Sequence, residues 1–333
     1  MSAIAAFVSF SVATIFAVAC TTAREELATD RPLGSSAAIT LPAEITSMSA
    51  INGSSTVAAG LADGQVAVWN GRDGAPAVVV KAHVARVLAV GSTGDGREVW
   101  SVATDGSLAR TRIAPGAQPV SHQLDLRLAP TRAAAFSADG AMLVTGGEFG
   151  EIRVFDTGSR ALRHQLRGHR TELQALAVRP GSGVVASASA EADLRVWDTA
   201  AGREIGFVDS DLSLFALGFS PRDGMLASGG VDRRLTLRDS TTFKPVGELA
   251  LQAPQMVATL AWTADGRFIA LGDLDDATLS KGGIQIVDPV SRAVVASLDT
   301  GGVPARAIGF AEPGVVVAIV GPELRAWTVA AIR

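Results

Sequence analysis

Short apolar runs separated by turn-forming residues recur along most of this chain, at intervals of about 42 residues. The clearest copy extends from Gly168 to Asp198. It contains apolar runs at Leu173–Val178 and Val184–Ser189, and a third run that ends at Trp197. Runs of this length, bounded by glycine, proline, serine and acidic residues, are typical of β-strands. Each copy therefore predicts three strands, and the segment before the next copy has room for a fourth.

Two patterns repeat in register through the chain. The third strand of each copy alternates apolar and variable positions and closes on an aromatic residue or its substitute, in the quartets Val66–Trp69, Leu108–Thr111, Ile152–Phe155, Leu194–Trp197, Leu235–Arg238, Ile284–Val287 and Leu324–Trp327. The first strands align independently, at Ile45–Ala50, Val87–Ser92, Thr131–Phe136, Leu173–Val178, Leu214–Phe219, Val257–Trp262 and Ala305–Phe310. Asp-Gly pairs such as Asp139-Gly140 predict tight hairpins, because glycine supplies a positive φ. The sequence thus predicts an all-β chain of seven four-stranded antiparallel units.

The clearest copy opens with Gly168-His169 and ends with Trp197-Asp198, and in this it resembles the repeat of the WD-repeat family of β-propellers. The resemblance implies one seven-bladed β-propeller over residues 37–333, with a four-stranded antiparallel sheet as each blade. It also implies that Ala37–Leu41 supplies the outer strand of the last blade. Such closure removes the exposed strand edge that an open ring would carry.

In that family a histidine before the first strand, a serine or threonine on the second, an aspartate in the next turn and the tryptophan form a hydrogen-bonded set. The matching residues here are His169, Ser187 or Ser189, Glu191 in place of the aspartate, and Trp197. We expect these residues to be structural, because a buried imidazole or indole N–H needs a hydrogen-bond partner. A hydrolase triad is disfavoured, since the groups lie within repeats and no G-x-S-x-G turn accompanies them.

The first residues follow a different pattern. The sequence carries no charge from Ala3 to Ala19, and Cys20 follows a small-x-small site. We expect residues 1–19 to be a secretory signal peptide and residues 20–36 a flexible tether. The segment resembles the lipobox of bacterial lipoproteins, which implies an exported protein, lipidated at Cys20 and attached to the periplasmic face of a membrane. A soluble periplasmic protein and an uncleaved signal anchor are the alternatives.

Composition narrows the function further. The 29 basic and 33 acidic side chains give a net charge of −4, which argues against an electrostatic hold on nucleic acid. The single cysteine excludes a disulfide within the chain and a thiolate metal cluster, and no zinc, haem or phosphate-binding motif occurs. We therefore expect no catalytic residues, cofactor or metal, and a non-enzymatic platform that binds an unidentified protein or peptide. A structural role in outer-membrane assembly and a propeller enzyme or cofactor binder are the alternatives.

One connection is longer than its counterparts. Between the second and third strands of the sixth copy, Asp273–Gly283 adds about seven residues where the other copies use a tight turn. The family resemblance implies that this insertion lies on the face where partners dock. The predicted partner-binding residues are Asp273, exposed Leu274, Asp275, Asp276 and exposed Leu279, together with Arg233 and Arg306 of the adjacent copies. A solvated loop is the alternative. A calcium loop is disfavoured, because Thr278 and Ile284 replace its required glycine and glutamate.

Overall fold

A computed structural model describes residues 39–40, 43–51, 56–70, 76–114, 120–123, 131–222, 224–251, 255–275 and 278–332. In this part of the chain nearly all regular structure is β-strand, apart from the short 3-10 helix η2 (Ala330–Ile332). The predicted signal peptide, the tether and Cys20 lie outside the described residues. No helix in the described ranges is long and apolar enough to cross a membrane.

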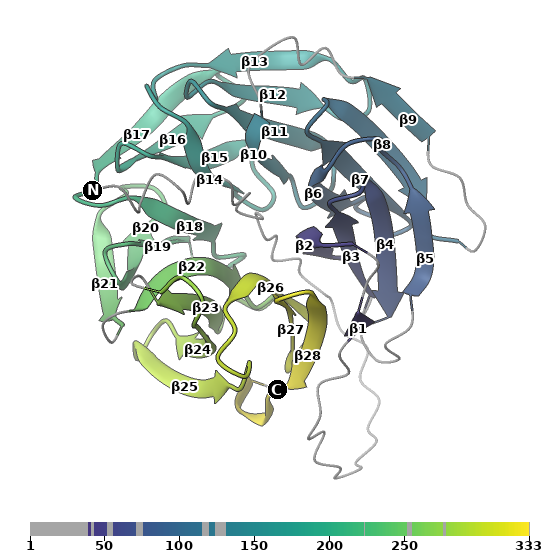
Figure 1. Ribbon diagram of the computed structural model, residues 1–333. Coiled ribbons are helices and arrows are strands. Elements are labelled where there is room, and N and C mark those ends of the chain that lie inside the picture. The colour runs from purple at the N-terminus through teal and green to yellow at the C-terminus, as the bar shows by residue number, and fades with distance from the viewer. Residues whose placement is uncertain are drawn as a thin grey trace.

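Seven four-stranded antiparallel sheets form a ring, as Figure 1 shows. The innermost strands, which number blades 1 to 7, are β2 (Ile45–Ala50), β6 (Val87–Ser92), β10 (Thr131–Phe136), β14 (Leu173–Val178), β18 (Leu214–Phe219), β22 (Gln255–Trp262) and β26 (Ala305–Glu312). The second strands are β3 (Thr56–Leu61), β7 (Glu98–Ala103), β11 (Met142–Gly147), β15 (Val184–Ser189), β19 (Met225–Gly230), β23 (Ile269–Asp275) and β27 (Val315–Val320). The predicted seven-bladed propeller is confirmed.

The outer half of each blade completes the sheet. The third strands are β4 (Gln65–Asn70), β8 (Ser107–Arg112), β12 (Ile152–Asp156), β16 (Asp193–Asp198), β20 (Arg234–Asp239), β24 (Ile284–Asp288) and β28 (Glu323–Thr328). The outer strands are β5 (Pro76–Lys81), β9 (Val120–Gln123), β13 (Leu162–Leu166), β17 (Arg203–Asp209), β21 (Pro245–Ala250), β25 (Ala293–Leu298) and β1 (Ile39–Thr40). The first five innermost strands have the predicted bounds, and the last two are longer.

The ring closes through a strand from the N-terminal side. β1 pairs antiparallel with Leu324 and Glu323 of β28, so the last blade has the order β1-β28-β27-β26. Ile45 of blade 1 and Ile319 of blade 7 belong to one buried apolar cluster, which fills the junction between the two blades. The predicted closing strand is therefore confirmed for Ile39–Thr40, and the rest of Ala37–Leu41 lies outside the described residues.

Glycines on the second strands let neighbouring blades approach closely. A Cβ added to Gly60 on β3 would lie 2.3 Å from Cγ1 of Val87, on the innermost strand of the next blade. Gly146 on β11 has the same relation to Leu173, whose Cδ1 would be 2.3 Å away. Larger residues at these positions would push the blades apart, since packed interiors have no spare volume.

Aspartates at the ends of the third strands hold the next turn. The Asp198 carboxylate accepts the backbone N–H groups of Ala200 and Ala201 at 2.9 and 3.0 Å. Asp156, Asp239 and Asp288 accept backbone N–H groups in the same way in blades 3, 5 and 6. An aspartate side chain that binds the backbone two or three residues later favours a turn over continued strand. This recurring contact explains why the quartets of the sequence mark strand ends.

A β-bulge interrupts every innermost strand near its start, after the first residue in six strands and after the third residue, Val257, in β22. The register with the second strand shifts there and leaves one residue of the innermost strand unpaired. The seven bulged residues are Thr46, Leu88, Arg132, Gln174, Phe215, Ala258 and Arg306. A bulge turns a side chain out of the regular alternation of a strand. In this ring the bulges of blades 1, 4, 5, 6 and 7 bring residues of different chemistry to one end of the central channel, whereas the bulged Leu88 of blade 2 is buried in an apolar cluster.

Candidate functional site

The innermost strands converge on a cavity of about 130 Å³, which we call the mouth cavity. Five of the seven bulged residues line it, namely Thr46, Gln174, Phe215, Ala258 and Arg306. The remaining lining residues are Glu44, Ile45, Arg86, Met256, Leu274, Leu279, Pro304 and Ala305. Because these residues come from six of the seven blades, the cavity lies at the centre of the ring. It opens at the end where the chain enters the innermost strands.

The two sides of the mouth cavity differ in polarity. Blades 5, 6 and 7 form an apolar wall that consists of Phe215, Met256, Ala258, Leu274, Leu279, Pro304 and Ala305. Blades 1, 2 and 4 contribute Thr46, Glu44, Arg86 and Gln174, and Arg306 continues this polar side from blade 7. The Thr46 hydroxyl donates within the protein, to backbone oxygens at 2.6 and 2.9 Å. The cavity therefore has an apolar wall facing a charged rim.

The predicted insertion forms part of the apolar wall. β23 continues to Asp275, so that Leu274 lies opposite Met256 of β22. Beyond it, the Asp275 N–H donates to the Lys281 oxygen at 2.7 Å, and the Leu279 N–H donates to the Asp275 oxygen at 2.8 Å. The insertion is thus hydrogen-bonded into blade 6 at its base, whereas Thr278, Ser280 and Lys281 are exposed.

Two predicted side chains of the insertion are not exposed. Leu274 is only 6% exposed, because the strand alternation turns it towards the mouth cavity, and Leu279 is half-buried in the same wall. The expectation that both leucines are exposed is therefore wrong. Asp273 is 2% exposed, and its carboxylate accepts the Gly283 N–H at 2.8 Å and amide groups of Gln255 and Gln285 at 3.2 and 3.1 Å. Asp273 thus holds the base of the insertion and does not face a partner.

The other predicted binding residues are divided. Arg306 lines the mouth cavity, whereas Arg233 lies in the exposed tight turn of blade 5, with φ 60°, and is not among the residues that line the cavity. Asp276 lies outside the described residues. Burial raises the pKa of the Asp273 carboxyl, and the hydrogen bonds from Gly283 and Gln285 oppose that effect.

Ion pairs join charged residues near the starts of the innermost strands. Glu44 of blade 1 contacts Arg306 of blade 7 and lies 3.5 Å from Arg86 of blade 2. The three side chains are between 34% and 41% exposed. On blade 3 the bulged Arg132 contacts Glu148 and lies 3.7 Å from Glu172 of blade 4. Exposed ion pairs add little stability, so these contacts contribute little to holding the ring together.

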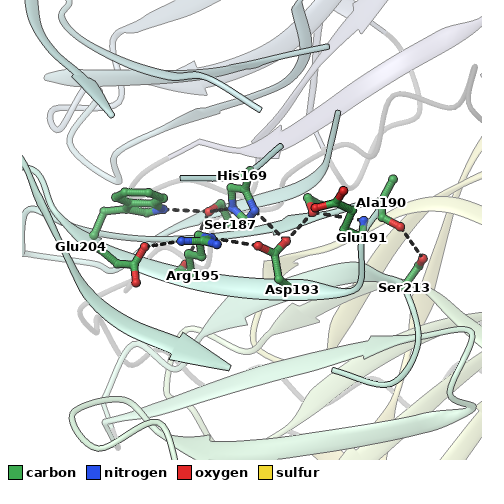
Figure 2. A network of polar contacts seen from close by, with 10 residues as sticks. His169, Ser187, Ala190, Glu191, Asp193, Arg195, Glu204 and Ser213 are labelled. Atoms are coloured by element: carbon green, nitrogen blue, oxygen red, sulfur yellow. Dashed lines mark hydrogen bonds and ion pairs between the residues drawn. The ribbon is translucent and has the colours of Figure 1, made fainter. Parts of the chain in front are cut away.

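A second candidate set, the predicted polar network, lies inside blade 4 (Figure 2). The Trp197 indole N–H donates to the Ser187 hydroxyl at 2.8 Å, and that hydroxyl lies 2.6 Å from His169 Nε2. His169 Nδ1 lies 2.7 Å from the Asp193 carboxylate. A carboxylate only accepts, so Nδ1 carries the proton and Nε2 accepts from Ser187. The result is a directional chain from tryptophan through serine and histidine to aspartate.

The acid in this network is Asp193 and not the predicted Glu191. Glu191 lies in the turn before β16 with its side chain exposed, whereas Asp193 is the first residue of β16 and is 7% exposed. Ser189 donates to the Asp193 carboxylate, and Arg195 joins that carboxylate to Glu204 at 2.8 and 2.7 Å. The shorter aspartate reaches His169 from the strand, so both predicted serines belong to the network. Glu191 contributes only its backbone N–H, which donates to the Ser189 hydroxyl at 3.2 Å, and its carboxylate takes no part.

Blade 2 contains a related network that the sequence did not show in full. His83 Nδ1 lies 2.5 Å from the Ser107 hydroxyl, which donates to Asp105 at 2.7 Å, and His83 Nε2 lies 2.7 Å from Ser101. Ser107 is the first residue of β8, as Asp193 is of β16. A polar residue at the start of a third strand was the available signal. Burial lowers the pKa of His83 to about 4, against the attraction of Asp105, and burial likewise lowers the pKa of His169.

Both networks are closed by their own members, so they present no free nucleophile to a substrate. In the described residues no group of three or more histidine, cysteine, aspartate or glutamate side chains is placed to hold a metal ion. The arrangement in blades 2 and 4 satisfies buried polar groups. In the described part of the chain, openings for another molecule include the mouth cavity and a cavity of about 340 Å³, which Phe149, Arg153 and His169 help to line.

Comparison with known proteins bears on the blade 4 network. Residues 160–198 match the family described as WD domain, G-beta repeat. The chain is similar to WD-repeat proteins. WD repeat-containing protein VIP3 of Arabidopsis thaliana is 23% identical over 184 residues, which cover 51% of this chain and 56% of that protein. Pre-mRNA-processing factor 19 homolog 2 of the same plant is 25% identical over 241 residues, or 70% of this chain and 45% of that protein.

A third relative, small ribosomal subunit protein RACK1y of Oryza sativa subsp. japonica, is 25% identical over 141 residues, 40% of this chain and 41% of that protein. The chain spans about half the length of the curated relatives it matches. The matched WD repeat begins just before β13 and ends with β16. Each repeat thus supplies the outer strand of one blade and three strands of the next.

The other blades keep only parts of the network. In blade 1 the Trp69 N–H is buried and finds no hydrogen-bond partner among the described residues, because Ala59 occupies the position of Ser187. In blade 5 Arg238 replaces the tryptophan, and in blade 6 Leu271 and Val287 replace the serine and the tryptophan. Polar pairing is therefore complete in blade 4, altered in blade 2 and replaced by apolar packing in blade 6.

Proposed function

We propose that this protein is a non-enzymatic platform that binds a protein or peptide over the mouth cavity, with the blade 6 insertion as part of the docking surface. The observation that carries the proposal is the mouth cavity itself, an opening with an apolar wall beside a rim of three partly exposed charged side chains. Apolar surface with a polar border is typical of protein-binding sites.

The names of similar proteins agree with this proposal. One relative is called a small ribosomal subunit protein and another THO complex subunit 3, and both names describe parts of larger assemblies. The closed networks of blades 2 and 4 favour a structural role for the buried histidines, which leaves binding as the function with a site of its own.

The docking proposal can be tested by shortening the insertion. Residues 276–280 are replaced by Asn-Gly, so that Asp275 and Lys281 still pair and the buried Leu274 is kept. The protein is then purified from detergent extract and its bound proteins are identified. We expect normal folding with loss of the partner that the unaltered protein retains.

A matched control changes the turn that follows β24, at the other end of that strand from the insertion. Val290 is 81% exposed in the turn after β24, and Val290→Asn should leave partner recovery unchanged. If the shortened variant recovers the partner in the same yield as the unaltered protein, the docking surface lies elsewhere.

Export and lipid attachment at Cys20 are part of the proposal and are supported by the sequence alone. The apolar segment before the single cysteine is the supporting pattern. Mass spectrometry of the membrane fraction should find a modified Cys20 as the first residue, and Cys20→Ser should move the protein out of that fraction. An intact Met1 in the mature protein would exclude a lipoprotein.

A further inference from the structure

The size of the mouth cavity limits what can enter it. Pockets for drug-sized ligands and cofactors have volumes of roughly 300–1,000 Å³, whereas the mouth cavity measures about 130 Å³. An apolar cavity of about 150 Å³ is known to accept one benzene molecule. The mouth cavity therefore has room for one apolar side chain and not for a cofactor.

The walls of the cavity favour an apolar occupant at depth. Phe215, Met256 and Leu274 come from three different strands and surround the space from blades 5 and 6. Pro304 and Ala305 extend the same apolar surface into blade 7. A charged or amide side chain placed against this wall would lose water without gaining a partner there, which costs free energy.

The rim sets the charge next to that side chain. The charged residues that line the cavity are Glu44, Arg86 and Arg306, with a formal sum of +1. Two guanidinium groups and one carboxylate leave an excess of positive charge at the rim. This charge attracts a further carboxylate, and it does so more strongly at low salt.

We propose that the mouth cavity takes one apolar side chain of a partner segment, of leucine to phenylalanine size, and that an adjacent acidic residue of that segment binds Arg86 and Arg306 beside Glu44. This proposal rests on the proposed function and adds the chemistry of the partner. A buried apolar anchor beside a charged contact is the usual layout of a binding hot spot and its border.

The methionines provide a direct probe of occupancy. The chain has five methionines, and among Met48, Met142, Met225 and Met256 only Met256 lines the mouth cavity. Protein labelled with 13C at the methionine methyl groups is titrated with N-acetyl-Leu-Asp-amide, and the Met256 signal is assigned with Met256→Leu. We expect the Met256 signal to move on titration while those of Met142 and Met225 stay in place.

Three further dipeptides separate the two halves of the proposal. N-acetyl-Ala-Asp-amide should bind at least about tenfold more weakly, because it removes three buried carbons from the anchor. N-acetyl-Leu-Asn-amide should bind about threefold to fivefold more weakly at low salt, a preference that falls at high salt because exposed charges are screened. N-acetyl-Leu-Lys-amide should bind most weakly of the leucine probes.

Two variants and a matched control locate the effect. Ala258→Phe fills the cavity from its wall and should abolish the Met256 response. Arg306→Gln should bind the Leu-Asp and Leu-Asn probes equally. Arg132→Gln alters the arginine in the same bulge position of blade 3, which does not line the cavity, and should keep the preference for aspartate.

The results distinguish this proposal from the docking proposal. Equal binding of the Leu and Ala probes, the strongest binding by the Lys probe, or no Met256 response to any probe overturns the anchor chemistry. If the shortened insertion still loses the partner in that case, the docking surface stands and only its chemistry fails. If the probes behave as expected but the shortened variant keeps its partner, the cavity binds such side chains and the docking proposal fails.

Discussion

Blades 4 and 6 have the same four-stranded frame and different interiors. In blade 4 the second strand carries Ser187 and the third carries Trp197, and both are joined to His169 by hydrogen bonds. In blade 6 the same two positions hold Leu271 and Val287, which are fully buried in an apolar cluster shared with blade 5. One blade is held by a directional chain of polar contacts and the other by apolar packing.

This difference affects the turn between the second and third strands. In blade 4 the turn must bring Asp193 to His169 and Ser189, so it cannot lengthen without breaking the network. Blade 6 makes no such demand, and its acid at the end of the second strand, Asp273, holds the base of an insertion instead. Without the polar network, the connection between the second and third strands of blade 6 can lengthen while the blade keeps its packing.

The largest effect should come from the apolar interior of blade 6. Leu271→Ala removes a fully buried side chain and should lower the free energy of unfolding by about 3 kcal/mol, because a cavity remains. Urea unfolding measures the change. Val290→Ala, at an 81% exposed position of the same blade, should change it very little. A loss below about 1 kcal/mol for Leu271→Ala would show that packing at this position is unimportant.

Acid should weaken blade 2 and spare blade 6, which contains no histidine. The pKa of His83 is lowered from 6.5 to about 4 by burial, so at pH 5 the unfolded chain binds a proton that the folded chain does not. The contribution of neutral His83 to the free energy of unfolding is fully present above pH 6.5 and is lost as the pH falls towards 4. The loss is on the order of 2 kcal/mol by pH 5.

Melting temperatures at pH 7 and pH 5 measure this loss. His83→Gln should depend less on pH than the unaltered protein, because the group that titrates is gone. Equal pH dependence of the two proteins would contradict a role for His83.

The polar chain of blade 4 can be broken at its centre. His169→Ala leaves Asp193 and Ser187 buried without their histidine partner and should cost about 1–3 kcal/mol in urea unfolding. His164→Ala on β13 changes a half-buried histidine outside the network and should cost less. Similar losses of stability for the two variants would mean that the hydrogen bonds of His169 add nothing beyond the packing of its imidazole ring.

The smallest expected effect is a gain of stability from a substitution in blade 1. Ala59→Ser places a hydroxyl where Ser187 stands in blade 4 and should give the buried Trp69 N–H its missing partner, which adds about 1 kcal/mol. The gain should vanish in a Trp69→Phe background, because the indole donor is then absent. A gain that persists there would have another cause.

The repeated pattern was sufficient to predict the blades, their strand order and the pairing of Ile39–Thr40 with the last blade. Strand alternation and Asp-Gly turns are local signals, so they can be read along the chain. The substitution of Asp193 for Glu191 could not be predicted, because it depends on which of two nearby acids reaches His169 in space.

The mouth cavity was missed for a similar reason. Its lining joins residues as distant as Glu44 and Arg306, and the bulges that turn Phe215 and Ala258 inwards have no signature of their own in the sequence. The available hint was the second position of each predicted first strand, which varies between charged, polar and apolar residues while its neighbours stay mostly apolar. The prediction that Leu274 is exposed was wrong because the first residues of the insertion extend β23 and pair with β22.

Each repeat spans the outer strand of one blade and three strands of the next, and this offset affects how the number of repeats can change in evolution. A duplication or deletion of about 42 residues adds or removes one outer strand and three inner strands, wherever its break points fall. The remaining strands can then regroup in fours, and β1 still pairs with the third strand of the last blade. Copy number can therefore vary by whole units through recombination, without leaving any strand unpaired.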